Sequence, residues 1–241
     1  MIFDVAALTD KGPRSINEDV AAFWKLGSDS LAIAVADGLG GMGGGSDASN
    51  IAVDVLRRHL TEQELSEENL LKIAFSAHGA IVEAQLSRPS LGRMATTLTA
   101  AVFNGSKLVG VHCGDTRAAI ARGTGIIKLT SEHSEGERLF QAGKLSKEEQ
   151  ISYPRNNILE SALGIHGDIR IDTFSFDLRD GDRVFLSSDG VHQVVYLREM
   201  QDVSMESSSA SIFCEKMDAA VKERGARDNY SLVAVFLTDF S

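Results

Sequence analysis

Short apolar segments that follow one another along the chain constrain the fold more than any other feature of the sequence. Val, Ile, Leu and Ala dominate these segments, and polar or glycine-containing stretches bound them. They lie at residues 2–8, 19–25, 31–36, 96–103, 107–113, 117–122, 170–176, 183–187 and 231–237. Most follow one another directly, which favours antiparallel strands, because a parallel connection needs a long crossover. The sequence therefore predicts an α+β fold in which helices pack outside antiparallel sheets.

Three longer segments between the strands have apolar residues at helical spacing. They cover residues 48–59, 70–84 and 210–221. Ser66 precedes two glutamates, which is the pattern of a helix N-terminus. The stretch 134–157 is polar, contains a capping-box pattern, and is predicted to form a short helical flap.

The overall composition excludes several classes of protein. The chain has 241 residues, of which 43% are hydrophobic and 24% charged, so we expect one globular domain over residues 1–241. Its formal net charge of −10 argues against binding to nucleic acid or to an anionic membrane surface. No apolar run approaches the roughly 20 residues of a membrane span. Because the start also lacks the pattern of a signal peptide, we expect a cytoplasmic protein.

Four aspartates share one local setting, since each borders an apolar strand segment. Asp37, Asp115 and Asp189 follow such segments, and Asp228 precedes the last one. Any one of them alone is explained by ordinary turn chemistry, because Asp-Gly and Asp-Asn are common turn sequences. If the strand ends converge, however, the carboxylates meet and repel one another unless a cation neutralises them. Carboxylates without a His/Cys cluster favour Mg²⁺ or Mn²⁺ over Zn²⁺.

The segment Gly12–Asp19 places an arginine near two further acids. Two metal ions about 3.5 to 4 Å apart can activate a water for attack on phosphorus, which makes phosphoester hydrolysis a natural chemistry for such a site. Arg14 could grip two phosphate oxygens. The alternative, equally weighted from this segment alone, is a solvated loop arginine paired with Glu18.

These residues resemble the blocks of the metal-dependent protein phosphatase (PPM, type 2C) family, in order and across nearly the whole chain. The family's Asp-Gly-x-Gly-Gly signature is similar to residues 37–41. The other matching blocks are Arg14 with Asn17, Glu18 and Asp19, then Ala48-Ser49, Thr96-Thr97, residues 114–117, Leu129-Thr130 with His133-Ser134, residues 157–164, residues 188–190 and Asp228-Asn229. The short flap and compact length resemble bacterial members. The resemblance implies a sandwich of two antiparallel β-sheets flanked by α-helices, with a metal site at one edge.

The resemblance also implies a role for each matching residue. Asp37 is expected to bridge two core Mn²⁺ or Mg²⁺ ions, with Gly38 lending its carbonyl, Asp189 and Asp228 holding one ion and Glu18 the other. Asp19 and Asn229 are expected to support these metal ligands from behind, and Arg14 is expected to bind phosphate. Asp115 corresponds to a ligand of a third, weaker ion.

Two departures from the family pattern change the expected chemistry. Leu39 stands where many eukaryotic members have a histidine proposed to protonate the leaving group, and a leucine cannot donate a proton, so water is expected to serve. Gln193 stands where many bacterial members have another aspartate for the third metal. Because a neutral amide binds a hard cation weakly, we expect a loose third site that depends mainly on Asp115.

The expected function is hydrolysis of phosphoserine and phosphothreonine in other proteins. Its partners would be phosphorylated substrates, including a cognate serine/threonine kinase or that kinase's targets, and the family pattern favours a monomer. A regulatory pseudophosphatase that only binds partners is the main alternative, although it would be expected to lose metal carboxylates. A two-metal nuclease is a further alternative, but the chain has neither a basic stripe nor an aromatic platform for nucleic acid.

Overall fold

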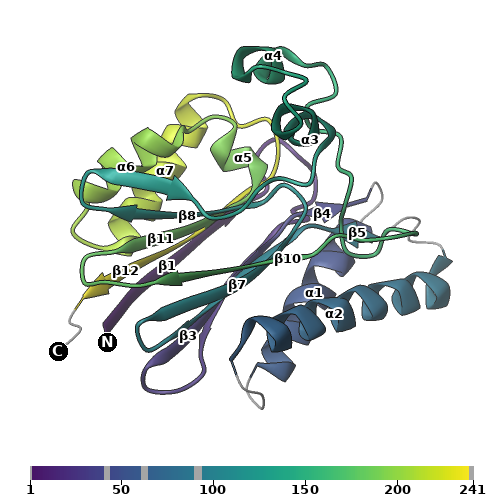
Figure 1. Cartoon of the computed structure of the whole chain (residues 1–241), viewed down its shortest axis with the longest axis horizontal. Helices are drawn as coiled ribbons and strands as arrows, with labels where there is room; N and C mark the ends of the chain where they lie inside the picture. Colours follow the sequence, from purple (N-terminus) through teal and green to yellow (C-terminus); the bar gives the residue numbers. More distant parts are fainter. Residues whose placement is uncertain (1, 41–43, 61–64, 90–93, 239–241) are drawn as a thin grey trace.

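A computed structural model describes residues 2–40, 44–60, 65–89 and 94–238, and within them the strands form two five-stranded antiparallel sheets. The first sheet has the order β1-β12-β11-β8-β9 and the second β10-β7-β6-β3-β2. A short two-stranded pair, β4-β5, stands apart from both. Figure 1 shows the sheets face to face with helices on both outer sides. The predicted two-sheet sandwich is confirmed.

The strands and helices alternate little along the chain. The strands are β1 (Ile2–Asp10), β2 (Val20–Lys25), β3 (Ser30–Ala36), β4 (Gly38–Leu39), β5 (Ala95–Thr96), β6 (Leu98–Asn104), β7 (Lys107–Cys113), β8 (Arg117–Arg122), β9 (Gly125–Lys128), β10 (Asp172–Asp177), β11 (Arg183–Ser187) and β12 (Tyr230–Thr238). The helices are α1 (Gly44–His59), α2 (Glu67–Ser87), α3 (Glu135–Gln141), α4 (Lys147–Ser152), α5 (Asp189–His192), α6 (Leu197–Met205) and α7 (Ala210–Glu223).

The central strands are buried on both faces, which explains why they are nearly continuous apolar runs. In β3, Leu31 and Ile33 point into the layer between the two sheets, whereas Ala32 and Ala34 point toward the helices. The alternation follows from the period of two residues in a strand. Small alanines on the helix-facing side let α1 and α2 approach the sheet closely.

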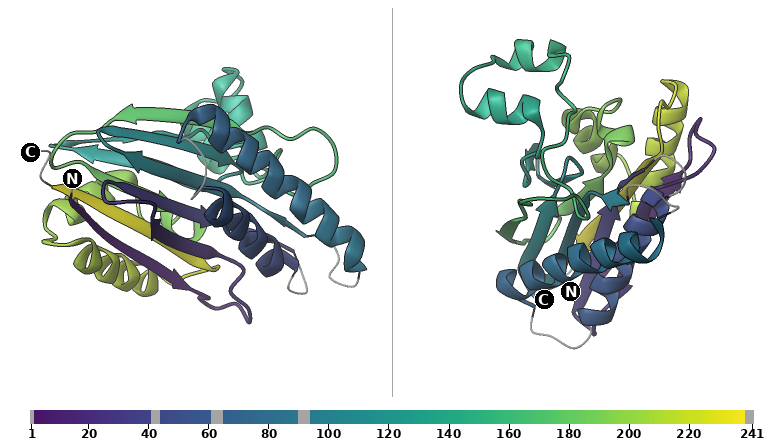
Figure 2. Two further views of the ribbon diagram at one scale, coloured as in Figure 1. Left: turned by 90° about the horizontal axis from the view of Figure 1, so that it is seen from below. Right: turned by 90° about the vertical axis from the view of Figure 1, so that its right-hand side faces the viewer.

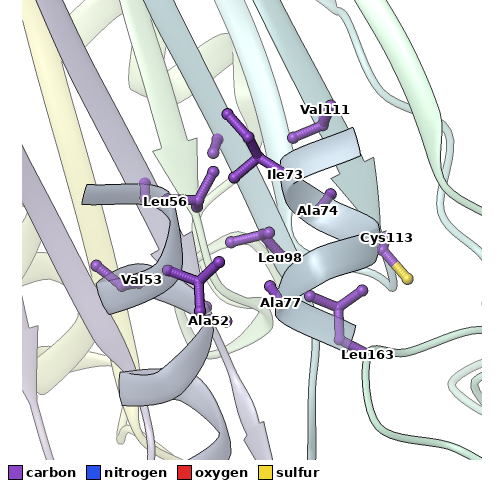
Figure 3. Close-up of a cluster of buried hydrophobic side chains, with 14 of the residues drawn as sticks. Ala52, Val53, Leu56, Ile73, Ala74, Ala77, Leu98, Val111, Cys113 and Leu163 are labelled. Carbon is purple, nitrogen blue, oxygen red and sulfur yellow. The ribbon is translucent and has the colours of Figure 1, made fainter. Parts of the chain in front are cut away.

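Helices α1 and α2 cover the outer face of the second sheet. Figure 3 shows Leu56 of α1, Ile73 and Ala77 of α2, and Leu98 and Val111 of the sheet in one buried cluster. On the opposite side of the molecule, α5, α6 and α7 cover the first sheet (Figure 2). Both sheets therefore have their outer faces sealed, and the strand ends stay free to carry polar residues.

The flap predicted at 134–157 contains two short helices, α3 and α4, which project from one end of the sandwich (Figure 1). Ser134 caps α3, and Ser146 with Glu149 forms the predicted capping box of α4. Ser66 caps α2, as its sequence indicates. The structure adds four short elements that the sequence analysis did not predict, β4, β9, α5 and α6. No helix of the described ranges is long and apolar enough to span a bilayer.

Candidate active site

Five carboxylates from distant parts of the chain line one cavity of about 330 Å³. They are Glu18, Asp37, Asp115, Asp189 and Asp228, and the cavity also contains Arg14, Gly38 and Asn229 from the predicted site. The topology explains the convergence. Strands β3, β7 and β11 end at the same edge of the sandwich, and the antiparallel strands β2 and β12 begin there. Residues that flank these strand ends therefore meet.

Asp37 is held through its main chain by two threonines of the β5–β6 region. Its N–H donates to Thr97 Oγ1 at 3.0 Å, and its carbonyl accepts from Thr97 N–H and from the Thr96 hydroxyl, both at 2.9 Å. These threonines are fully buried. The backbone at Asp37 is therefore fixed, and its carboxylate is directed into the cavity.

Glu18 and Gly38 lie close together because two glycines leave the necessary space. The N–H of Gly38 donates to the Glu18 carbonyl at 3.1 Å, and the Gly45 N–H donates to Glu18 Oε1 at 3.2 Å. A Cβ atom on Gly38 would lie 2.4 Å from the Gly45 carbonyl oxygen and 2.5 Å from that of Glu18. Only glycine fits at this close approach of backbone. Gly41, the last residue of the predicted signature, lies outside the described residues.

Asp19 and Asn229 support the carboxylates from behind. The Ser188 hydroxyl donates to Asp19 Oδ2 at 2.8 Å, while Asn229 Oδ1 accepts from the Glu18 N–H at 2.9 Å. Asp19 is only 7% exposed, and its second oxygen has no hydrogen-bond partner. A buried carboxylate oxygen without a donor is costly unless positive charge faces it. Burial raises the pKa of Asp19 to about 6, although its bond to Ser188 acts in the opposite direction.

The pKa values of Asp37, Asp115 and Asp189 are also raised above their ordinary range. Burial is the main cause in each case, and it raises the pKa of Asp115 to about 7. The pKa of Asp37 is raised well above its ordinary value by burial and by the charges of Asp19 and Asp189. The pKa of Asp189 is raised by burial and then by the charge of Asp228. The cavity thus concentrates negative charge that ordinary solvation does not offset.

Two of these carboxylates are engaged by other side chains. Arg14 Nη2 donates to Asp228 Oδ2 at 2.6 Å, and Gln193 Nε2 donates to Asp189 Oδ2 at 2.8 Å. Arg14 therefore pairs with Asp228 and not with Glu18, which was the alternative partner. Among the described residues, no three Asp, Glu, His or Cys side chains are arranged to hold a metal ion as they stand. The oxygen-only donor set and the uncompensated charge nevertheless fit hard divalent cations.

His133, at the root of the flap, holds the loop that carries Asp115. Its N–H donates to the Gly114 carbonyl at 2.7 Å, and its ring Nδ1 accepts from the Gly114 N–H at 3.2 Å. Its Nε2 then donates to Asp172 at 3.1 Å. The side chain is buried between these partners, so His133 supports the root of the flap.

The comparisons with known proteins agree with this geometry. The model of the protein phosphatase 2C family matches residues 13–234. The chain belongs to the protein phosphatase 2C family. A serine/threonine phosphatase, stp, of Listeria welshimeri is 32% identical over 235 residues, which are 94% of this chain and 93% of that protein.

Solved structures of this phosphatase family superpose on nearly the whole chain. The serine/threonine phosphatase of S. agalactiae has a TM-score of 0.90 and 26% identity over 98% of this chain and 100% of its own. The catalytic domain of PstP in complex with two manganese ions has a TM-score of 0.86 and 25% identity over 98% and 99%. This chain is therefore a metal-dependent serine/threonine protein phosphatase of the bacterial type.

The structure brings every predicted site residue to the cavity or directly behind it. It also reveals supporting residues whose roles the sequence did not indicate. Thr97 fixes Asp37, Ser188 links Asp19 to the Ser231 N–H, and Asn157 lines the cavity from the flap. Thr97 matched a family block without an assigned role. Ser188 stands beside the predicted Asp189, but nothing in its local sequence indicates a partner so distant in the chain.

Proposed function

We propose that this phosphatase hydrolyses phosphoserine and phosphothreonine in other proteins by attack of a metal-activated water, with two core metal ions held by Glu18, Asp37, Gly38, Asp189 and Asp228. The observation that carries this assignment is the convergence of these carboxylates with Arg14 in one cavity. Mn²⁺ or Mg²⁺, when bound, supplies Lewis-acid activation of water and positive charge for the phosphate oxygens.

Each residue of the site has a role that follows from its surroundings. Asp37 sits on a backbone fixed by Thr97, which would keep its carboxylate directed at the two metal ions. Gly38 presents its carbonyl beside Glu18, where a side chain would not fit. Asp19 supports these metal ligands from behind, and one of its carboxylate oxygens has no hydrogen-bond donor within the described part of the protein. Cations bound there would relieve the like-charge repulsion between these carboxylates.

Arg14 is proposed to transfer from Asp228 to the substrate phosphate. Its guanidinium is half exposed and bound to a single carboxylate oxygen, so little holds it there. A phosphate dianion accepts two parallel N–H bonds from an arginine. Release of Arg14 would at the same time free Asp228 for its proposed metal.

Two departures from the family pattern lead to finer proposals. Leu39 lines the cavity and offers no proton, so water is proposed to protonate the leaving alkoxide. Asp115 is proposed to hold a weak third ion, because the amide of Gln193 donates to Asp189 and contributes no charge. The flap at 134–157 is proposed to be part of the single domain 1–241, bordering the cleft through Asn157.

Phosphorylated proteins are the proposed partners, including a cognate serine/threonine kinase or its targets. A monomer in the cytoplasm, without nucleic-acid or membrane binding, is proposed from the acidic charge and from the family pattern. Light scattering of the purified protein and cell fractionation test the monomer and its location.

Phosphate release from a phosphothreonine peptide tests the proposed function. The wild type is assayed with Mn²⁺, Mg²⁺ or a chelator and is compared with Asp37→Asn and Asp189→Asn. Asp54→Asn is a matched control, because Asp54 is exposed on α1 and lies outside the cavity. We expect metal-dependent release that both cavity variants lose and the control keeps. A wild type that binds metal but releases no phosphate from varied phosphopeptides would favour the regulatory binding module.

A further inference from the structure

A second cavity, of about 570 Å³, lies beside the catalytic one and has no part in the proposed chemistry. We name it the flank pocket. Its walls include Gln85 and Leu86 at the C-terminal end of α2, Met94 and Ala95 at the start of β5, and Gly164 and Ile165 from the segment before β10. Figure 1 shows the end of α2 and the β4–β5 pair at the same end of the molecule.

The two cavities share a wall made of one strand pair. Leu39 of β4 lines the catalytic cavity, and its direct partner across the pair is Ala95 of β5, which lines the flank pocket. Paired strands lie about 4.8 Å apart. The next residue of β5, Thr96, bonds to the carbonyl of Asp37. Contacts in the flank pocket are therefore made on the strand that bonds to the backbone of Asp37.

The flank pocket offers a mainly apolar surface, and its polar side chains are Gln85 and the exposed His166. Leu86, Met94, Ala95 and Ile165 supply hydrocarbon, and Leu86 is 76% exposed at the rim. The polar side chain of Gln85 is already used, because its Nε2 donates to the carbonyls of Met94 and Gly164 at 2.5 and 2.7 Å. An exposed leucine at the rim of an apolar hollow is typical of a binding site for another apolar group.

We propose that the flank pocket binds an apolar side chain of the substrate protein, located two to four residues from the phosphorylated residue. This proposal rests on the proposed function, since it places the phosphorylated residue in the neighbouring cavity. An extended peptide of two to four residues covers about 7 to 14 Å, which exceeds the strand spacing of about 4.8 Å between the paired residues Leu39 and Ala95. Leu, Ile, Met and Phe side chains are the chemistry that this surface accepts.

The net charge of the protein favours recognition of the substrate peptide by apolar contacts over recognition by electrostatic attraction. With a formal net charge of −10, the phosphatase does not attract a phosphorylated, acidic segment over long range. Affinity for the flanking sequence must then come from short-range contacts, and apolar burial supplies these without any charge requirement. The flank pocket is the apolar surface that continues directly from the wall of the catalytic cavity.

A peptide series with Mn²⁺ present tests the proposal. Phosphothreonine peptides of alanine, serine and glycine carry one leucine at each position from four residues before to four residues after the phosphothreonine. The readout is the ratio of kcat/KM for each peptide to kcat/KM for p-nitrophenyl phosphate, which is too small to reach the flank pocket. We expect one or two positions between two and four residues away to raise this ratio roughly tenfold over the all-alanine peptide.

Substitution of a rim residue tests whether the preference for leucine in the peptide depends on the flank pocket. Leu86→Glu is expected to abolish the leucine preference, because it places a charge at the apolar rim. Phe75→Glu is the matched control, since Phe75 is on the same helix, is 46% exposed and lies outside the pocket. It should leave the preference intact.

Three results would overturn the proposal. Equal ratios at every leucine position, with both substrates hydrolysed, would refute the flank pocket as a substrate site while leaving the phosphatase function in place. Loss of the preference in both variants would point to a general charge effect. A change in molecular mass of Leu86→Glu in light scattering, without a change in the ratio, would assign the surface to a second copy of this chain. Failure of the proposed function would instead abolish hydrolysis of p-nitrophenyl phosphate as well.

Discussion

Replacement of Arg14 by alanine should separate substrate binding from stability and from metal binding. The Arg14–Asp228 pair is short, at 2.6 Å, but its side chains are 57% and 44% exposed. Exposed pairs of this kind contribute about 0 to 1 kcal/mol to the free energy of unfolding. Charge-assisted hydrogen bonds to a phosphate are worth about 1.5 to 3 kcal/mol, which corresponds to a loss of roughly 10- to 150-fold in kcat/KM. Arg14→Ala should therefore be stable and slow.

The effect of these substitutions on metal binding distinguishes a phosphate-binding arginine from a metal-site residue. The guanidinium of Arg14 competes with a cation for the Asp228 carboxylate, so its removal should leave the Kd for Mn²⁺ unchanged or lower it. Asp228→Asn should raise that Kd instead. Arg14→Lys keeps the charge but loses the two parallel donors, so it should recover only part of kcat/KM.

Urea unfolding, calorimetric Mn²⁺ titration and phosphopeptide kinetics on the same preparations measure the three effects. A clear weakening of Mn²⁺ binding in Arg14→Ala would refute this reasoning, because it would make the arginine part of the metal site. So would an unchanged kcat/KM, which would leave Arg14 as a solvated loop residue.

The remaining predictions concern stability, pH, the third ion and the leaving group. Arg122→Ala should lower the free energy of unfolding by roughly 3 to 5 kcal/mol, because it leaves the fully buried Asp182 carboxylate without the guanidinium that binds it through two bonds of 2.7 Å; urea unfolding close to wild type would contradict it. Burial lowers the pKa of His112 to about 3 from its ordinary 6.5, so the folded state binds fewer protons than the unfolded state between these values. Stability should therefore rise with pH across this window and level off above it, and a profile as steep in His112→Asn would assign the effect elsewhere. Gln193→Asp should tighten the weakest Mn²⁺ site in calorimetric titration, and an unchanged isotherm would show that the amide does not limit it. Because Leu39 supplies no proton, aryl phosphates should turn over faster than alkyl phosphates at saturation, and equal rates with chemistry limiting would count against water as the acid.

The sequence analysis predicted the main strands and the long helices closely, because their apolar patterns repeat over many residues. The shorter elements were the ones it missed. Segment 125–128 forms β9 through its pairing with β8, and α6 packs beside α7 against the first sheet. Neither element has an apolar pattern long enough to predict its secondary structure from the sequence. Similarly, the segment predicted as one strand over 96–103 is divided, because Thr96 and Thr97 turn toward Asp37 before β6 begins at Leu98.

The sequence by itself determined which residue types are available and where each stands relative to a strand. The aspartates beside apolar strands, the glycine after Asp37 and the order of the family blocks were all visible in it, and they were sufficient to predict the class of chemistry. Such features are local, because turn chemistry and strand burial depend on near neighbours along the chain.

Only the tertiary structure decided which distant groups touch. The pairing of Arg14 with Asp228, the orphaned oxygen of Asp19 and the bond of Gln193 to Asp189 all depend on how the sheets stack and on where loops cross. The flank pocket likewise exists because the end of α2, β5 and segment 164–166 pack together from three parts of the chain. Hydrogen bonds and burial act over a few ångströms in space, and no periodicity along the chain encodes separations of this kind.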